Sequence, residues 1–130
     1  MKKLVHFLIF IWTLPQNLAG LILIFMYGLS FKTKYKSACI YDKFPAGGVS
    51  LGYFILFGNY EYAVSEADIK HEYGHFIQNL IFGPFYLLVI GIFSVLNYKF
   101  GFSKFYYDFW TEKWADKLGG VTRKKFAHDT

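Results

Sequence analysis

Two short polar motifs, at residues 71–75 and 111–116, constrain the fold more than any other feature of the sequence. Residues 71–75 read His-Glu-Tyr-Gly-His. On a helix, His71 and His75 lie four residues apart and share a face, so both imidazoles can bind one metal ion. In this H-E-x-x-H pattern the two histidines bind zinc and the glutamate, here Glu72, acts as general base. The first motif therefore predicts a helix that carries half of a zinc site.

The surrounding sequence supports a helix over residues 65–82. Apolar residues recur there at helical spacing, while the two histidines lie on a different face. Ser65 followed by Asp68 is the pattern of an N-terminal capping box. Gly83-Pro84 is expected to end the helix.

The second motif, Thr111-Glu-Lys-Trp-Ala-Asp116, predicts another helix over residues 111–119. Thr111 is the expected N-cap, and two glycines at 119 and 120 would end the helix. Glu112 would complete a set of three ligands, and three protein ligands leave the fourth zinc position open, as in catalytic sites. Asp116, one turn further on, can accept a hydrogen bond from the second ring nitrogen of a ligand histidine, His71.

H-E-x-x-H followed by E-x-x-x-D resembles the gluzincin metallopeptidases, the thermolysin-like clan. This resemblance implies that His71, His75 and Glu112 hold Zn²⁺. It implies that Glu72 is the general base, and that Asp116 orients a histidine.

The resemblance also implies a tyrosine or histidine that stabilises the transition state. By residue type the candidates are Tyr106, Tyr107 and His128. Unlike for the larger gluzincins, no separate substrate domain is expected within these 130 residues. The span from 71 to 120 also resembles small bacterial proteins with H-E-x-G-H, a Gly-Pro-aromatic apolar stretch and T-E-x-W-A-D, which implies no substrate.

A β-hairpin is expected over residues 37–57. Residues 37–42 and 49–57 are aromatic and β-branched, and a loop with Pro and Gly joins them. In thermolysin-like enzymes an edge strand beside the zinc helix holds the substrate backbone, and the resemblance implies this role for Val49, Ser50, Leu51 and Gly52. Gly52 would permit the close approach of a substrate. An ordinary core strand accounts for the same pattern.

An apolar stretch over residues 4–31 contains no Asp, Glu, Lys or Arg and is long enough to span a bilayer. Thr13-Leu-Pro-Gln-Asn17 interrupts it, and Pro15 would kink a helix there. The stretch is therefore either one kinked transmembrane helix, which we favour, or two short helices that form a hairpin. The chain is 55% hydrophobic and only 18% charged, a composition that also favours a membrane. A cleaved signal peptide is the alternative, although the stretch is long for one and no A-x-A-like site follows it.

A second apolar stretch, over residues 84–97, lies between the two motifs. Because all three ligands must meet at one ion, this stretch cannot cross a membrane completely unless the zinc itself lies within the membrane. We expect a re-entrant or core helix, with the site near the interface and Trp110 and Trp114 in an aromatic belt. A buried helix of a soluble fold is the alternative.

The expected fold is mainly α with a small β-hairpin (α+β), in one domain over residues 1–130. Its order is an N-terminal transmembrane helix, the zinc-ligand helix, the apolar helix and the second ligand helix. The expected function is that of a membrane-associated zinc metallopeptidase, a hydrolase of peptide or protein substrates in contact with lipid of a bacterial inner membrane. The net charge of +5 suits anionic lipid, and no nucleic-acid motif accompanies it.

Two other classes stay open on the sequence. One is a non-catalytic membrane protein that zinc stabilises and that binds peptides or a partner. The other is a metal-free membrane interaction protein.

Overall fold

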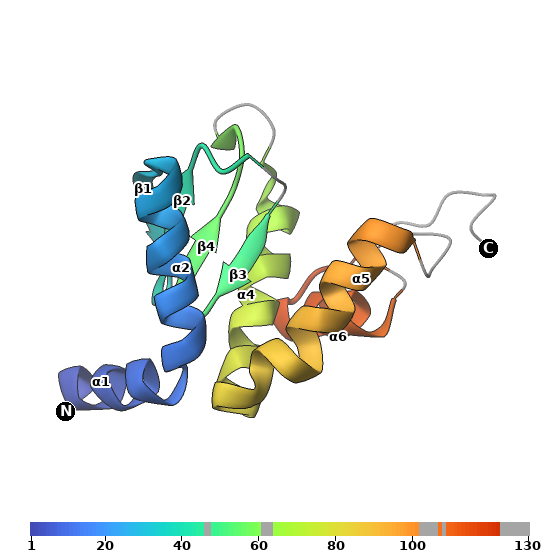
Figure 1. Ribbon diagram of the computed structural model, residues 1–130. Coiled ribbons are helices and arrows are strands. Elements are labelled where there is room, and N and C mark those ends of the chain that lie inside the picture. Colours follow the sequence, from blue (N-terminus) through green and yellow to red (C-terminus); the bar gives the residue numbers. More distant parts are fainter. Residues whose placement is uncertain (46–47, 61–63, 102–106, 108, 123–130) are drawn as a thin grey trace.

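The computed structural model describes residues 1–45, 48–60, 64–101, 107 and 109–122, and shows a mainly helical chain with a small mixed sheet (Figure 1). The α+β class is therefore confirmed. The helices are α1 (Lys2–Trp12), α2 (Leu14–Tyr27), α4 (Glu66–Phe82), α5 (Ile92–Phe100) and α6 (Trp110–Gly119). A 3₁₀ turn η1 (Gly83–Phe85) and a π turn η2 (Leu87–Gly91) connect α4 to α5. The strands are β1 (Ser30–Tyr35), β2 (Ala38–Asp42), β3 (Val49–Leu51) and β4 (Phe54–Leu56).

The sheet differs from the hairpin predicted over residues 37–57. Its spatial order is β1-β2-β4-β3, in which β2 and β4 are parallel and the two outer pairs are antiparallel. The predicted strand over 49–57 is divided into β3 and β4 by a turn at Gly52, whose φ of 61° is a conformation that glycine adopts without strain. As a result, β3 is an edge strand with one side of its backbone unpaired within the sheet.

Helices cover both faces of this sheet. Ile40 and Ile55 are fully buried on the face that packs against α4. Leu51 and Leu56 lie on the opposite face, against α2. The alternation of Ile55 and Leu56 between the two faces follows the two-residue period of a strand. The sheet therefore fixes the position of α4 from one side, while α2 supports it from the other.

The predicted transmembrane helix over residues 4–31 is not one helix. The helical part of this range ends at Tyr27, and the last residues of the range belong to β1. Within the helical part, α1 and α2 meet at Thr13 with a bend of 85°. Pro15 lies in the first turn of α2, where its missing N–H breaks no helical hydrogen bond. Among the described helices none is by itself long and apolar enough to cross a membrane. Two bent pairs, α1 with α2 and α4–η1 with η2–α5, meet that requirement only when taken together.

Polar residues of this apolar stretch hold the turn between β3 and β4. The Asn17 side-chain oxygen accepts a hydrogen bond from the Tyr53 backbone N–H at 2.8 Å. From the other side, the Asn79 side-chain oxygen accepts one from the Gly52 N–H at 3.3 Å. Gln16, equally buried, donates to the backbone of η1. These bonds position the edge strand relative to α4, and they explain why polar residues interrupt the stretch.

The apolar helix predicted over residues 84–97 starts later, at Leu87, and runs through η2 and α5 to Phe100. The chain reverses direction between α4–η1 and η2–α5 with an angle of 116°, and the regular part of α5 extends to Phe100. This reversal returns the chain toward α4, and α6 therefore packs beside α4 (Figure 1). The two motifs, which are distant in the sequence, consequently meet.

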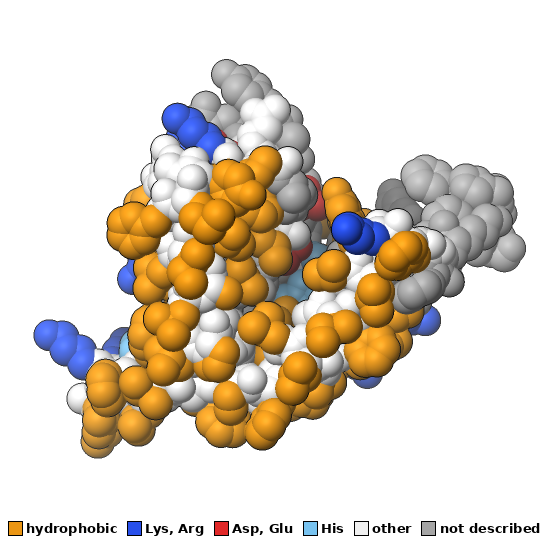
Figure 2. Space-filling view, viewed as in Figure 1, with side chains coloured by type: hydrophobic (Ala, Val, Ile, Leu, Met, Phe, Trp, Pro, Cys, Tyr) orange, Lys and Arg blue, Asp and Glu red, His pale blue; other side chains and the backbone are white. Residues whose placement is uncertain are grey.

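Large apolar side chains are exposed along α1, α2, η1–η2 and α5. Figure 2 shows them over most of the visible face, with a hollow between the sheet and α5. Helix α1 buries none of its residues. Exposed apolar surface of this extent is typical of a face that contacts lipid or another protein.

Candidate metal centre

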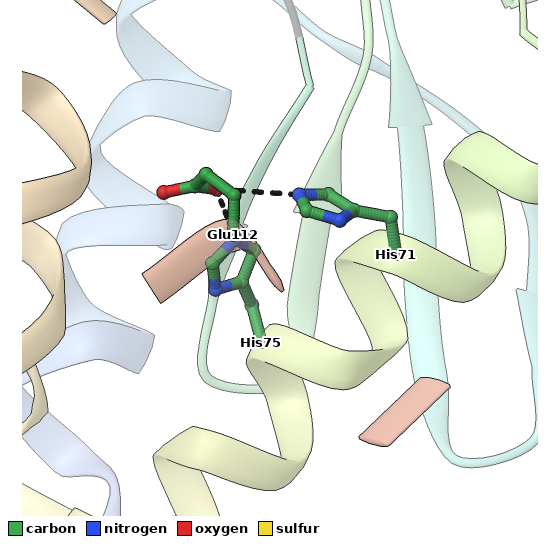
Figure 3. A group of neighbouring side chains, drawn as sticks. All are labelled: His71, His75 and Glu112. Carbon is green, nitrogen blue, oxygen red and sulfur yellow. Dashed lines mark hydrogen bonds and ion pairs between the residues drawn. The ribbon is translucent and has the colours of Figure 1, made fainter. Parts of the chain in front are cut away.

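Helix α4 carries the first motif, as predicted. Ser65 is the N-cap, and the capping box with Asp68 is complete in both directions. Gly83 ends the helix. His71 and His75 lie one turn apart and point toward α6 (Figure 3).

Two glycines allow α6 to approach α4 closely. A Cβ on Gly74 would lie only 1.8 Å from the carbonyl oxygen of Ala115, and one on Gly119 would lie 1.9 Å from the carbonyl oxygen of Lys70. The backbones of the two helices are thus in direct contact. This contact brings Glu112, in the first turn of α6, to the histidines of α4.

The three predicted ligands form one compact group. The Glu112 Oε1 atom lies 2.9 Å from His75 Nε2 and 3.3 Å from His71 Nε2 (Figure 3). All three ligand atoms lie within 4.8 Å of one another. Ligands about 2.0–2.1 Å from a tetrahedral zinc ion are separated by roughly 3.3–3.4 Å. The group could therefore hold one metal ion after small adjustments of the side chains.

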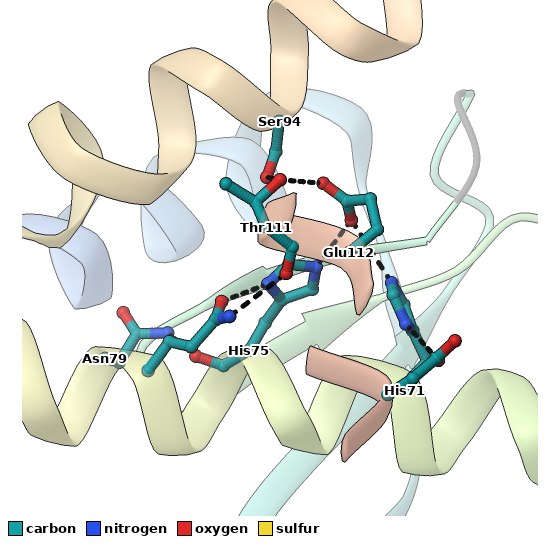
Figure 4. A network of polar contacts seen from close by, with 8 residues as sticks. His71, His75, Asn79, Ser94, Thr111 and Glu112 are labelled. Atoms are coloured by element: carbon teal, nitrogen blue, oxygen red, sulfur yellow. Dashed lines mark hydrogen bonds and ion pairs between the residues drawn. The ribbon is translucent and has the colours of Figure 1, made fainter. Parts of the chain in front are cut away.

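The other ring nitrogen of each histidine is held by a specific acceptor (Figure 4). His71 Nδ1 donates to Asp116 at 2.7 Å, as the sequence predicts. His75 Nδ1 donates to the Gln78 side-chain oxygen at 2.6 Å, and Gln78 in turn donates to the Thr111 carbonyl at 3.1 Å. These bonds fix both rings with Nε2 directed at Glu112, the tautomer that a metal ligand needs.

Sequence reasoning missed Gln78. The only signal was its position three residues after His75, on the neighbouring part of the same face of the helix. A neutral amide at that position also has many structural uses, so the spacing alone does not assign it to the site.

Thr111 has a different role from the predicted one. The N-cap of α6 is Phe109, and Thr111 lies inside the helix, fully buried. Its hydroxyl donates to Glu112 Oε2 and accepts a hydrogen bond from Ser94 of α5 at 3.0 Å (Figure 4). Because Oε2 is engaged in this way, Oε1 is the oxygen that faces the two histidines.

The electrostatics of the group suit a cation. Burial opposes a charge on His71, but hydrogen bonds with Asp116 and Glu112 outweigh it and raise the pKa of the imidazole to about 9. Burial also opposes the Glu112 carboxylate, yet hydrogen bonds from His71 and His75 lower its pKa well below the usual range. Without a metal, the group therefore holds a proton on His71 beside an ionised Glu112. A bound metal ion would replace that positive charge.

Glu72 lies next to the ligands but is not among them. Its side chain is buried, and burial raises the pKa of the carboxyl group. Among the described residues its Oε1 atom has no hydrogen-bond partner. Gly48 approaches it so closely that a Cβ there would lie 2.9 Å from Glu72 Oε2. A buried, unpartnered carboxylate oxygen is costly unless something else occupies the site, and a water molecule or substrate would satisfy it.

Glu72 and His75 open into a cavity of about 1090 Å³. Strand β3 lines one side through Val49, Ser50 and Leu51, and η2 and α5 line the other. Figure 2 shows carboxylate and imidazole atoms inside the hollow between these walls. Gly52, the fourth residue predicted to bind substrate, lies in the turn instead, where a Cβ would meet Asn17 at 2.0 Å.

Of the three residues proposed to stabilise a transition state, only Tyr107 is described. It lines the cavity, and its ring lies edge-on to that of His71 with 5.0 Å between centroids. Tyr106 and His128 lie outside the described residues. A second phenol, Tyr86, lines the cavity too, and burial raises its pKa well above the ordinary value. Nothing in the sequence distinguishes Tyr86 from the many packing aromatics.

No protein-family model, curated protein or solved structure matches this chain. Its chemistry must therefore be inferred from the arrangement of its own residues.

Proposed function

We propose that this chain is a membrane-associated zinc metallopeptidase of the gluzincin type, which hydrolyses peptide bonds in peptides or proteins. The observation that carries the proposal is the position of Glu72. This carboxylate is buried beside a three-ligand group, it has an oxygen without a partner among the described residues, and it faces a cavity large enough for a peptide. A purely structural zinc site would not need such a group, and it usually has four protein ligands.

Zinc suits the two imidazoles and one carboxylate of this group. Two histidines and a glutamate form a catalytic zinc set, and the acceptors Asp116 and Gln78 supply the outer hydrogen bonds that such sites need. When bound, zinc polarises the carbonyl of the scissile bond and lowers the pKa of water at the site.

Glu72 performs the proton transfers. Its raised pKa places it closer to neutrality than an exposed carboxyl, so it can both accept and return a proton. It takes a proton from the attacking water and delivers it to the nitrogen of the leaving amine. Gly48 lies against the carboxylate at the wall of the cavity.

The free edge of β3 aligns the substrate. An extended peptide that pairs with Val49–Leu51 would gain main-chain hydrogen bonds and pass Glu72 in a fixed register. Tyr107, whose ring lies beside that of His71 and lines the same cavity, would donate a hydrogen bond to the carbonyl oxygen as negative charge develops on it.

The exposed apolar face over α1, α2, η1–η2 and α5 supports the proposed association with a membrane (Figure 2). Lys2 and Lys3 at the start of α1 would meet anionic headgroups. Flotation with vesicles of phosphatidylglycerol and phosphatidylcholine checks this part of the proposal. Recovery of the protein only in the lipid-free fraction would contradict it.

The decisive experiment compares hydrolysis of a peptide library by zinc-loaded wild type, Glu72→Gln and Glu66→Gln. Glu66 is the matched control, because it lies on the same helix and makes only an exposed ion pair with Lys70. Loss of a general base is expected to lower turnover about 10²–10⁴-fold in Glu72→Gln. Glu66→Gln should retain wild-type turnover.

Two outcomes would contradict the proposal. Wild-type turnover in Glu72→Gln would remove Glu72 from the mechanism. A zinc-loaded wild type that cleaves nothing, but binds peptides, would favour a non-catalytic zinc protein.

A further inference from the structure

The cavity beside Glu72 has two walls of different character. One is the edge strand β3, which offers backbone hydrogen bonds. The other is η2 and α5, which offers apolar side chains. The apolar lining includes Val49, Leu51, Phe57, Leu87, Val95 and Leu96. Apart from His75 and three tyrosines, its ionisable lining residues are the acidic Asp68 and Glu72, and Asp68 is engaged in the capping box. These walls suit a chain with apolar side chains and disfavour acidic ones.

The mouth of the cavity merges with the exposed apolar surface of the molecule. Ile92, Val95 and Tyr98 line the cavity, yet they are 49%, 56% and 65% exposed. They are spaced three residues apart and so form one stripe along α5. Leu88 and Phe93 continue the apolar surface outward from this stripe without lining the cavity. A chain that leaves the outer apolar face can therefore enter the cavity without crossing a polar rim on the α5 side.

A polar atom on the strand wall also points to an extended ligand. Ser50 is 2% exposed and lines the cavity, and its hydroxyl has no hydrogen-bond partner among the described residues. An extended backbone running along β3 would supply that partner. The same path leads past Gly48 to Glu72.

From these features we infer that the substrate is an apolar segment of a membrane-anchored polypeptide, which reaches the site from the lipid side between β3 and α5. The inference rests on the proposed peptidase activity and adds the substrate class. Apolar residues on either side of the scissile bond bury surface against α5, while their backbone pairs with β3. A polar segment would lose its hydration against α5 without regaining hydrogen bonds there.

The test uses two membrane-anchored, internally quenched peptides in vesicles of phosphatidylglycerol and phosphatidylcholine. They differ only in the segment next to the membrane, which is rich in Leu and Val in one peptide and in Ser and Thr in the other. Burial of two further large apolar side chains corresponds to a preference of at least about 100-fold in kcat/KM for the apolar peptide. Equal kcat/KM for the two peptides would overturn the inference.

A pair of variants on the helical wall locates the effect. Val95→Asp places a charge at the mouth of the cavity and should lower cleavage of the apolar peptide at least about tenfold. Leu88→Asp makes a matched change on the membrane-facing surface outside the cavity, and its rate per vesicle-bound protein, with the bound fraction measured by flotation, should fall far less. Zinc content shows that both proteins keep the site. Equal loss of activity in the two variants would assign the effect to membrane binding, and would overturn the inference.

A further experiment tests whether the substrate enters from the lipid side. A flexible Gly-Ser spacer of about 15 residues between the anchor and the apolar segment moves that segment away from the membrane. Cleavage should then slow at least about tenfold. An unchanged rate would overturn access from the lipid side.

Failure of the peptidase proposal can be told apart from failure of this inference. If zinc-loaded wild type cleaves neither peptide, binding to Glu72→Gln is measured in the same vesicles. Preferential binding of the apolar peptide, weakened more by Val95→Asp than by Leu88→Asp for equal amounts of vesicle-bound protein, would support the inferred ligand class. Equal binding of both peptides would overturn it.

Discussion

Gly74 sets the separation of α4 and α6, so replacing it with alanine tests what holds the candidate metal centre together. The added Cβ would lie 1.8 Å from the Ala115 carbonyl oxygen and 2.6 Å from its carbon. Both are backbone atoms, so no side-chain rotation can relieve the clash. The helices must separate by about 1.2 Å to reach even a tight contact of about 3.0 Å.

This displacement should have a large effect on zinc affinity and a smaller effect on the free energy of unfolding. Ligand distances in metal sites are held to about 0.2 Å. A shift of this size therefore moves Glu112 out of reach of a metal ion bound to His71 and His75. We expect the affinity for zinc to fall at least about 100-fold. Overpacking costs about 1–3 kcal/mol, but alanine is about 1 kcal/mol more favourable than glycine in a helix. The free energy of unfolding of the metal-free protein should therefore fall by no more than about 2 kcal/mol.

The assay measures zinc affinity by competition with a chelator and stability by denaturant unfolding, both in detergent. Gly91→Ala is the control, because its Cβ would lie 3.2 Å from the flexible Leu87 side chain. The control should bind zinc like wild type. Wild-type zinc affinity in Gly74→Ala would refute the argument that close helix contact assembles the site.

Three further predictions test the residues around the ligands. Gln78→Leu removes the acceptor for His75 Nδ1 and should weaken zinc binding about 10–100-fold in a chelator competition; unchanged affinity would show that Gln78 does not orient the ring. Gly48→Ala places a Cβ 2.9 Å from Glu72 Oε2 and should lower kcat at least about tenfold at unchanged zinc content, whereas a change in zinc content alone would contradict the predicted role. Zinc binding should tighten about tenfold per pH unit from neutrality to about 9 and then level off, because below its pKa of about 9 His71 holds a proton that the metal must displace. Affinity that is independent of pH over this range would show that His71 does not carry that proton.

The sequence predicts the two ligand helices well because their signals are local. The capping box at Ser65 and the stop at Gly83 place the first helix at 65–82, against Glu66–Phe82 in the structure. The second, expected at 111–119, is Trp110–Gly119. Given two helices that share a metal ion, the positions of His71, His75, Glu112 and Asp116 follow from helical geometry.

The sheet could not be predicted in the same way, because its pairing depends on distant residues. The run over 49–57 looks like one strand, but the structure divides it at Gly52, in a turn that accepts a positive φ and is held by hydrogen bonds to the Asn17 and Asn79 side chains. The parallel pairing of β2 with β4 leaves no local mark in the sequence. The consequence for function is that β3, not an extended hairpin, forms the free edge beside Glu72.

The polar interruption of the first apolar stretch has a tertiary explanation as well. Sequence reasoning assigns the kink to Pro15, but Pro15 fits the first turn of α2. The bend lies at Thr13, and the Gln16 and Asn17 side chains bond to η1 and to the β3–β4 turn. Contacts made by the whole fold thus decide where the helix breaks.

Zinc content per chain, measured by elemental analysis on detergent-purified protein, tests the central claim most directly. The account predicts one zinc ion in wild type and in Glu72→Gln, and loss of that zinc in His71→Ala and Glu112→Ala. A wild type that holds no zinc after reconstitution, or that retains it without Glu112, would contradict the proposed metal centre.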